Sequence, residues 1–347
     1  MSDHGEAAGN GRWGPPYLLY LGQAADELAI KTARGLAFWR PDWCVGQYRH
    51  PGCAFSLDLP EMTLAEARTR GVNTMVIGTA NAGGVMAAET AADIVTALDA
   101  GLNVAAGLHQ KLRDDATIAA AARRNGRTLF DARDYGGILA VGTGDKRAGH
   151  RLLTVGTDCS VGKMYTALAL ERSLRKRGVA ADFRATGQTG IFVAGGGIPI
   201  DSVIADFISG AAELTSPARD DNGWDLIEGQ GSLVHPSYAG VSLGLLQGSQ
   251  PDALVVCHEP TRRHMRGLPH YPVPSLDACI AANLAGARLT NPAVKVVGVS
   301  LNTSRLPPQD AAAACAAISQ HLGLPCADPV SMGVESIVDN LLACCAN

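Results

Sequence analysis

Short apolar runs alternate with stretches of helical periodicity along the first half of this chain. Residues 17–21, 74–78, 103–106 and 128–131 are short and apolar, so they predict strands. Residues 89–100 and 114–125 lie between these runs and repeat their apolar positions every three to four residues, which predicts helices. Strands that alternate with helices indicate a parallel sheet in an α/β fold.

The second half repeats the same kind of pattern. Strands are predicted at residues 151–155, 181–184, 225–227, 253–257 and 294–300, and helices at 163–177, 201–213 and 310–318. Asp201 is well placed to cap the second of these helices. Between the halves, residues 142–150 are rich in glycine and charge, which predicts a linker.

The length of 347 residues corresponds to two domains at about 150 residues each. We place them at residues 15–145 and 146–347, after a polar, glycine-rich lead of residues 1–14 that we expect to be disordered. Hydrophobic residues make up 47% of the chain and charged residues 18%, a balance typical of compact globular proteins.

Charge and hydropathy exclude several classes of partner. A net charge of −4 gives no bulk attraction for nucleic acid, and no apolar run reaches the 18 to 20 residues of a membrane span. The first 14 residues lack the apolar core of a signal peptide. Nine cysteines without a CxxC pair predict reduced thiols rather than disulfides or a zinc site. We therefore expect a cytoplasmic protein without nucleic-acid or membrane partners.

A phosphate-binding loop follows the predicted strand at residues 151–155. The run matches GxxxxGK and consists of Gly156, Thr157, Asp158, Cys159, Ser160, Val161, Gly162 and Lys163, followed by Met164. Glycines let the backbone N–H groups surround an anion, the following helix adds partial positive charge, and the lysine adds a full charge. The sequence therefore predicts that this loop binds the phosphates of a cofactor.

Met164 occupies the position where phosphate-binding loops of this type usually carry the Ser or Thr that holds Mg²⁺. A thioether does not suit Mg²⁺, and Thr166 lies about 200° further round the helix. We therefore expect no metal, and a phosphate-rich ligand such as coenzyme A fits the loop better than a nucleotide that is hydrolysed with Mg²⁺.

Polar residues follow four predicted strands of the second half, where ligands of open α/β sheets bind. The candidate catalytic base is Glu228, with His235 as a second candidate. The alternatives are a carboxylate satisfied by glycine N–H groups or by Lys163, and a capped loop histidine. The N–H groups of residues 229–231 are candidates for facing an oxyanion. Candidate substrate-binding residues are Gln188, Gln230, Arg262 and Arg263, although the arginines could also form a solvated basic loop.

Longer runs connect the chain to a known family. GTDCSVGKM at residues 156–164, ATGQTGI at 185–191, residues 200–213 and 224–262, and GLPHYPVPSL at 267–276 together resemble the D-glutamate N-acetyltransferase family, long catalogued as a domain of unknown function. LYLGQA and PDWCVGQYRHPGC extend the resemblance into the first half. It implies an N-terminal Rossmann-like domain, a C-terminal P-loop NTPase-like domain, and transfer of acetyl from acetyl-CoA to D-glutamate or a related amino acid. We also expect a homo-oligomer.

Two rival functions remain open at this point. The phosphate loop is also similar to that of dethiobiotin synthetase, which shares GTD, VGK and a strand ending in EG but has Thr at the position of Met164. An ATP-dependent ligase or kinase of that type is one alternative. A non-catalytic nucleotide-binding sensor is the other.

Overall fold

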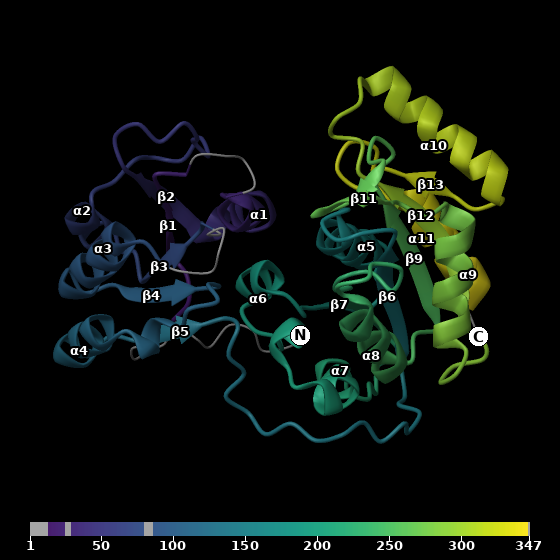
Figure 1. Cartoon of the computed structure of the whole chain (residues 1–347), viewed down its shortest axis with the longest axis horizontal. Coiled ribbons are helices and arrows are strands. Elements are labelled where there is room, and N and C mark those ends of the chain that lie inside the picture. Colours follow the sequence, from purple (N-terminus) through teal and green to yellow (C-terminus); the bar gives the residue numbers. More distant parts are fainter. Residues whose placement is uncertain (1–12, 25–28, 80–85, 346–347) are drawn as a thin grey trace. The chain divides into compact units, whose positions relative to one another are not determined.

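The computed structural model describes residues 13–24, 29–79 and 86–345, which form two α/β units (Figure 1). The first unit contains the described residues up to Gly136 together with Ile191–Pro199, and the second contains Gly137–Gly190 and the residues from Ile200 on. The sequence placed the boundary at residue 145. Backbone N–H groups of Thr143 and Gly144 donate to the Glu213 carboxylate, which holds the segment before that point to the second unit.

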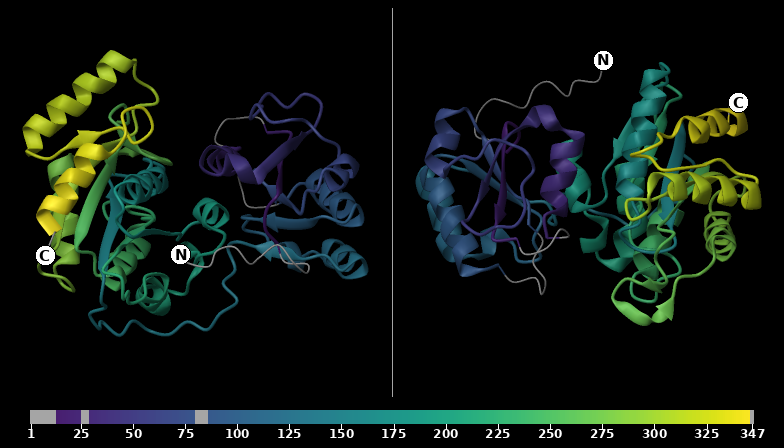
Figure 2. Two further views of the ribbon diagram at one scale, coloured as in Figure 1. Left: turned by 180° about the vertical axis from the view of Figure 1, so that it is seen from behind. Right: turned by 90° about the horizontal axis from the view of Figure 1, so that it is seen from above.

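The first unit is built on a five-stranded parallel sheet with the order β2-β1-β3-β4-β5. Its strands are β1 (Tyr17–Gly22), β2 (Cys44–Arg49), β3 (Thr74–Ile77), β4 (Asn103–Ala106) and β5 (Leu129–Asp131). Helices α2 (Leu64–Thr69), α3 (Ala88–Asp99) and α4 (Ala116–Asn125) bury their apolar side chains on one face. Helix α1 (Lys31–Trp39) covers the other (Figure 2).

The predicted disordered lead falls mostly outside the described residues, which begin at Trp13. Its last two residues are packed against the sheet. The Trp13 ring stacks on Phe130 with 3.8 Å between ring centroids, and the Gly14 N–H donates to Thr74 Oγ1 at 3.1 Å.

The second unit has a six-stranded parallel sheet with the order β13-β12-β9-β6-β8-β7. Its strands are β6 (His150–Gly156), β7 (Ala181–Arg184), β8 (Trp224–Ile227), β9 (Ala253–His258), β12 (Lys295–Leu301) and β13 (Cys326–Ala327). Nearly all residues of β6 and β9 are buried, as expected of central strands covered on both faces. This arrangement places β6 in the middle of the sheet.

Helices cover both faces of this second sheet. Helices α5 (Lys163–Lys176) and α11 (Glu335–Cys345) pack together on one face, and α8 (Ala239–Ser249) and α9 (Leu276–Ala287) on the other. Helix α10 (Pro308–Leu322) contacts the edge strand β13, and a hairpin of β10 (His264–Met265) and β11 (Leu268–Pro272) follows β9. None of the helices in the described ranges is both long enough and apolar enough to span a bilayer.

The prediction of a single helix at residues 201–213 is wrong. Two 3₁₀ turns, Ile200–Ser202 and Ala205–Phe207, precede a shorter helix, α7 (Ile208–Thr215). The Ile200 side chain is fully buried and its N–H donates to the Thr186 carbonyl. This tertiary contact fixes the chain before the helix, so Asp201 lies in a turn instead of capping the helix.

Candidate active site

The phosphate loop connects the central strand β6 to helix α5. A side chain at Gly156 would lie 2.8 Å from both the Cys257 carbonyl and Val161 Cγ2, so only glycine lets the loop leave the strand here. Gly162 has a φ of +102°, in the left-handed region that glycine adopts freely, and Lys163 begins the helix directly after it. The two glycines of the motif thus fix the beginning and the end of the loop.

The loop presents unpaired donors. Thr157 N–H donates to the Cys257 carbonyl, and Cys159 N–H donates to Asp158 Oδ1 at 2.7 Å. Within the described part of the chain, no protein acceptor lies in hydrogen-bonding range of the N–H groups of Ser160, Val161 and Gly162. Unpaired N–H groups at the N-terminus of a helix are the usual setting of an anion site.

Lys163 lies buried under this loop. Its Nζ donates to the Asp158 carbonyl at 2.8 Å, and its aliphatic stem passes over Gly229. A Cβ atom at residue 229 would lie 3.0 Å from Lys163 Cδ and 1.7 Å from the Thr154 carbonyl, so glycine is required there. Burial lowers the pKa of Lys163. A bound anion would favour its charged form, so the loop and the lysine suit the same ligand.

Arg262 holds the phosphate loop in place. Its guanidinium donates to Asp158 Oδ2 at 2.8 Å and to the Cys159 carbonyl at 2.7 Å, and it pairs with Glu259. Burial by itself would raise the pKa of the Asp158 carboxyl, but hydrogen bonds from Arg262 and from the Arg266 N–H lower it below its usual range. We call Asp158, Glu259 and Arg262 the loop clamp. Because both terminal nitrogens of its guanidinium donate inside the protein, Arg262 is not free to bind a substrate carboxylate in the paired manner.

Glu228 lies directly after β8 and is 6% exposed. Its Oε2 accepts the N–H groups of Thr186 and Gly187, both at 3.0 Å. A Cβ atom at Gly190, in helix α6 (Gln188–Ala194), would lie 2.2 Å from that oxygen, so the helix can approach the carboxylate this closely only with glycine. Burial raises the pKa of Glu228 to about 7, despite the two N–H donors. A pKa near the working pH is the most effective one for a general base or acid, so the raised pKa suits Glu228 to that role.

Profiles of the two domains of one family match most of the chain. The P-loop domain of DUF1611, a family described as a domain of unknown function, matches residues 139–338, and its Rossmann-like domain matches residues 48–135. The chain belongs to the DUF1611 family. Both the fold class and the family predicted from the sequence are confirmed.

Two curated relatives of this DUF1611 protein carry the name D-glutamate N-acetyltransferase. The relative from Pseudoalteromonas sp. is 51% identical over 327 residues, which is 94% of this chain and 98% of the relative. The relative from Tritonibacter scottomollicae is 51% identical over 328 residues, with the same coverage of 94% and 98%. A crystal structure of a DUF1611 protein from Anabaena variabilis ATCC 29413 has a TM-score of 0.86 at 31% identity, covering 95% of this chain and 100% of its own.

In this DUF1611 protein, both ring nitrogens of His235 have protein partners, so it is not a free base. It is 1% exposed; its Nδ1 accepts the Ser237 N–H at 3.1 Å, and its Nε2 lies 3.2 Å from the Arg266 carbonyl. These partners put the ring proton on Nε2 and leave no lone pair for a substrate. His235 therefore contacts the β10–β11 hairpin, and its Nε2 also lies 3.8 Å from Asp158 Oδ1 in the phosphate loop.

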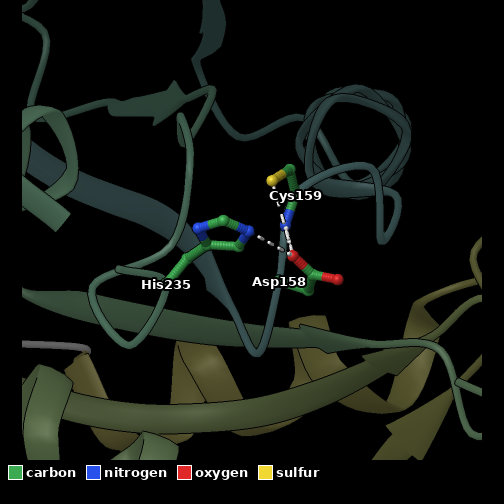
Figure 3. A group of neighbouring side chains, drawn as sticks. All are labelled: Asp158, Cys159 and His235. Carbon is green, nitrogen blue, oxygen red and sulfur yellow. Dashed lines mark hydrogen bonds and ion pairs between the residues drawn. The ribbon is translucent and has the colours of Figure 1, made fainter. Parts of the chain in front are cut away.

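His235, Asp158 and Cys159 meet beside the phosphate loop, as Figure 3 shows. One ligand atom from each lies within 4.8 Å of the others, a spacing that suits a metal ion, and among the described residues no other such group was found. Each of these side chains already has a protein partner. Asp158 accepts hydrogen bonds from Arg262 and from the Cys159 N–H, His235 Nε2 lies 3.2 Å from the Arg266 carbonyl, and Cys159 Sγ lies 3.4 Å from Asp158 Oδ1. Burial and Asp158 also raise the pKa of Cys159, which opposes a thiolate. Protein contacts alone thus account for the cluster.

The remaining predicted residues of this DUF1611 site surround Glu228 and the loop. Gln230 Nε2 donates to Thr186 Oγ1 at 3.1 Å, and Gln188 begins α6 (Gln188–Ala194), half-buried. Gly229 N–H donates to Thr154 Oγ1 at 3.0 Å, so it is not available for an oxyanion. Thr166 bonds the Gly162 carbonyl and Ser300 Oγ inside the core, and so it does not replace the hydroxyl missing at Met164.

The sequence reasoning gave no role to one residue that lies at the site. His258 ends β9 beside the phosphate loop, and its Nδ1 lies 2.9 Å from Thr157 Oγ1. Burial lowers the pKa of His258, so the imidazole is neutral around pH 7. The sequence showed a polar residue after this strand but not that β9 is a neighbour of β6.

Proposed function

We propose that this protein is an N-acetyltransferase that moves acetyl from acetyl-CoA to the amino group of D-glutamate or a closely related amino acid. The observation that carries the proposal is the phosphate loop with its buried lysine and with Met164 in place of a magnesium ligand, in a family whose relatives are named D-glutamate N-acetyltransferase. The relatives do not favour an ATP-dependent ligase or a nucleotide sensor.

The phosphates of acetyl-CoA bind to the loop in this proposal. Ser160, Val161 and Gly162 contribute backbone N–H donors, and Lys163 Nζ exchanges the Asp158 carbonyl for a phosphate oxygen. The loop clamp keeps the N–H groups aimed at the ligand because Arg262 binds the loop carbonyls from outside. No metal is required, since the lysine and the helix N-terminus supply the positive charge.

Glu228 accepts the proton of the substrate ammonium. The free amine then attacks the thioester carbonyl of the acetyl group, and the carbon–sulfur bond breaks as the amide forms. The proton that the nitrogen loses in this second step passes to the departing coenzyme A thiolate, and Glu228 releases the ammonium proton to solvent. Oε1 of Glu228 accepts no hydrogen bond from the described residues and is the oxygen left for the substrate, while Oε2 stays bound to Thr186 and Gly187. His235 acts as a positioning residue for the loop.

Arg263 is proposed to bind a substrate carboxylate, together with the amides of Gln188 and Gln230. The Arg263 side chain is exposed and, among the described residues, forms no ion pair or hydrogen bond, in contrast to its neighbour Arg262. Guanidinium groups bind carboxylates through paired hydrogen bonds. Two adjacent arginines thus have separate roles.

Alanine substitution at these two arginines is expected to have different effects. Arg262→Ala leaves Asp158 without its guanidinium, so we expect a loss of stability of about 2–3 kcal/mol and a higher KM for acetyl-CoA. Arg263→Ala is expected to leave Tm unchanged and to raise the KM for the amino acid about tenfold. Thermal unfolding measures the stability of each variant, and two-substrate kinetics measure its KM for acetyl-CoA and for the amino acid. An Arg262→Ala enzyme with normal stability and an altered KM only for the amino acid would reverse the assignment.

The proposed reaction is tested by incubating the protein with acetyl-CoA and mixtures of D- and L-amino acids, followed by chiral separation and mass spectrometry. We expect N-acetyl-D-glutamate as the main product. A thermal shift with acetyl-CoA in the presence of a chelator checks cofactor choice independently. Stabilisation only by ATP with Mg²⁺, and no acetylated product, would favour the ligase alternative.

The enzyme is proposed to work in the cytoplasm. All nine cysteines lie in the described residues, and none of them is paired. Free thiols, several of them buried, are typical of a reducing compartment. The substrates in this proposal are small molecules, and neither nucleic acid nor a membrane takes part.

A further inference from the structure

Helix α9 has apolar residues around its whole circumference. One side, with Cys279 and Ala287, is fully buried, and Gly286 lets the helix approach Leu246 closely. The middle of the opposite side is also apolar, but its side chains are only partly buried or exposed. A helix that is apolar on all sides is typical of one that packs against neighbours on both sides. Figure 1 shows α9 at the outside of its unit.

The partly covered side forms a shallow groove with the end of α10. We call its α9 residues the α9 seam: Asp277, Ile280, Ala281, Leu284, Ala285 and Arg288. Leu322 and Leu324 form the other wall. Leu289, which is 74% exposed, extends the apolar surface beyond Arg288. The groove is apolar in its middle, with an acidic residue at one end and a basic residue at the other. A partner surface with the same residues in the opposite order would be complementary to it.

The α9 seam is complementary to itself when it is reversed. A two-fold axis passing between Ala282 and Asn283 places Asp277 opposite Arg288 of a second copy. The same axis places Ile280 opposite Ala285, and Ala281 opposite Leu284. Every pair therefore joins opposite charges or a large side chain with a small one, which permits close packing of antiparallel helices.

We propose that the chain forms a two-fold symmetric dimer through the α9 seam, with the two α9 helices antiparallel. The charges support this partner. Among the described residues, the Arg288 side chain has no ion pair, and the ion pair of Asp277 is with the exposed His321, whose Nε2 lies 3.0 Å from Asp277 Oδ2. Asp277 and Arg288 lie eleven residues apart, about 16 Å along the helix, so two ion pairs close the two ends of the apolar contact.

Charge reversal tests the dimer and its register together. Sedimentation velocity of the full chain is expected to show a dimer. Asp277→Arg and Arg288→Asp each place two like-charge pairs in the interface, so each should raise the dimer dissociation constant about tenfold or more. The double variant D277R/R288D restores opposite charges across the axis, so its dissociation constant should return to within about threefold of the wild-type value. A variant that merely misfolds would not be rescued in this way.

Two further variants complete the test. Ala281→Glu places a charge in the apolar centre of the seam and is expected to give a monomer with an unchanged far-ultraviolet spectrum. Asp310→Arg is the matched control, because Asp310 is also an exposed acid in the first turn of a helix but lies outside the seam; it should leave the dimer intact. A wild-type protein that is monomeric at micromolar concentration would overturn the proposal, as would a double variant that dissociates like the single ones.

Discussion

Replacing Glu228 with Gln is expected to lower kcat about a thousandfold while the affinity for acetyl-CoA stays within about twofold of wild type. General base catalysis contributes factors of about 10² to 10⁴, and an amide cannot accept the ammonium proton. The Gln carbonyl oxygen can still accept the N–H groups of Thr186 and Gly187, so the fold around the site is retained. Steady-state kinetics and calorimetry with acetyl-CoA measure the two quantities separately.

Glu171→Gln is the matched control for this variant. Glu171 is 8% exposed in the same unit and also accepts a backbone N–H, from Phe183 at 3.1 Å. It takes no part in the proposed site, so kcat is expected to remain at the wild-type value. A Glu228→Gln enzyme as active as this control would show that another group, such as His258 beside the phosphate loop, accepts the proton.

The pH dependence of the same variant gives a second readout. Because the pKa of Glu228 is about 7, the wild-type rate should rise with pH up to about 7, and this limb should disappear in Glu228→Gln. The folded carboxyl binds its proton more tightly than the unfolded one, so its contribution to stability is complete below about pH 4.5 and is lost as pH rises through 7. The free energy of unfolding of wild type should therefore fall by on the order of 3 kcal/mol, relative to that of Glu228→Gln, as the pH rises through this range.

Replacing Lys163 with Met is expected to raise the dissociation constant for acetyl-CoA about a hundredfold. Methionine keeps an unbranched apolar stem over Gly229 but removes the charge that the loop offers to phosphate. The free protein should be as stable as wild type or more so, because a desolvated ammonium is removed from the interior. Calorimetry and thermal unfolding without ligand check both statements.

Lys176→Ala on the same helix is the control for charge. Lys176 lies in the last turn of α5 and is exposed, so its removal should leave acetyl-CoA binding unchanged. If Lys163→Met bound acetyl-CoA with the same affinity as Lys176→Ala, the phosphates would have to occupy another part of the protein, and the role given to the loop would be abandoned.

Local patterns predicted the main elements of both sheets. Residues 103–106 and 181–184 form strands with the predicted bounds, and the helix after the phosphate loop begins at Lys163 as the motif requires. Strand β2 (Cys44–Arg49) was missed because its run, CVGQYR, is only partly apolar and is stabilised by pairing with β1. Helix α9 was missed because its apolar residues lie on all sides and show no period.

Some features of the candidate active site also follow from the local sequence, and others depend on the tertiary structure. The sequence by itself determined the phosphate loop, because strand, glycines, lysine and helix are consecutive and their function depends on local backbone conformation. It also determined the absence of a hydroxyl at Met164 and the family. Only the tertiary structure decided that Arg262 clamps the loop, that His235 has both nitrogens occupied, and that Glu228 is buried with a raised pKa. These properties depend on strand order, which brings β8 and β9 to either side of β6, and neighbours in a parallel sheet lie far apart in the chain.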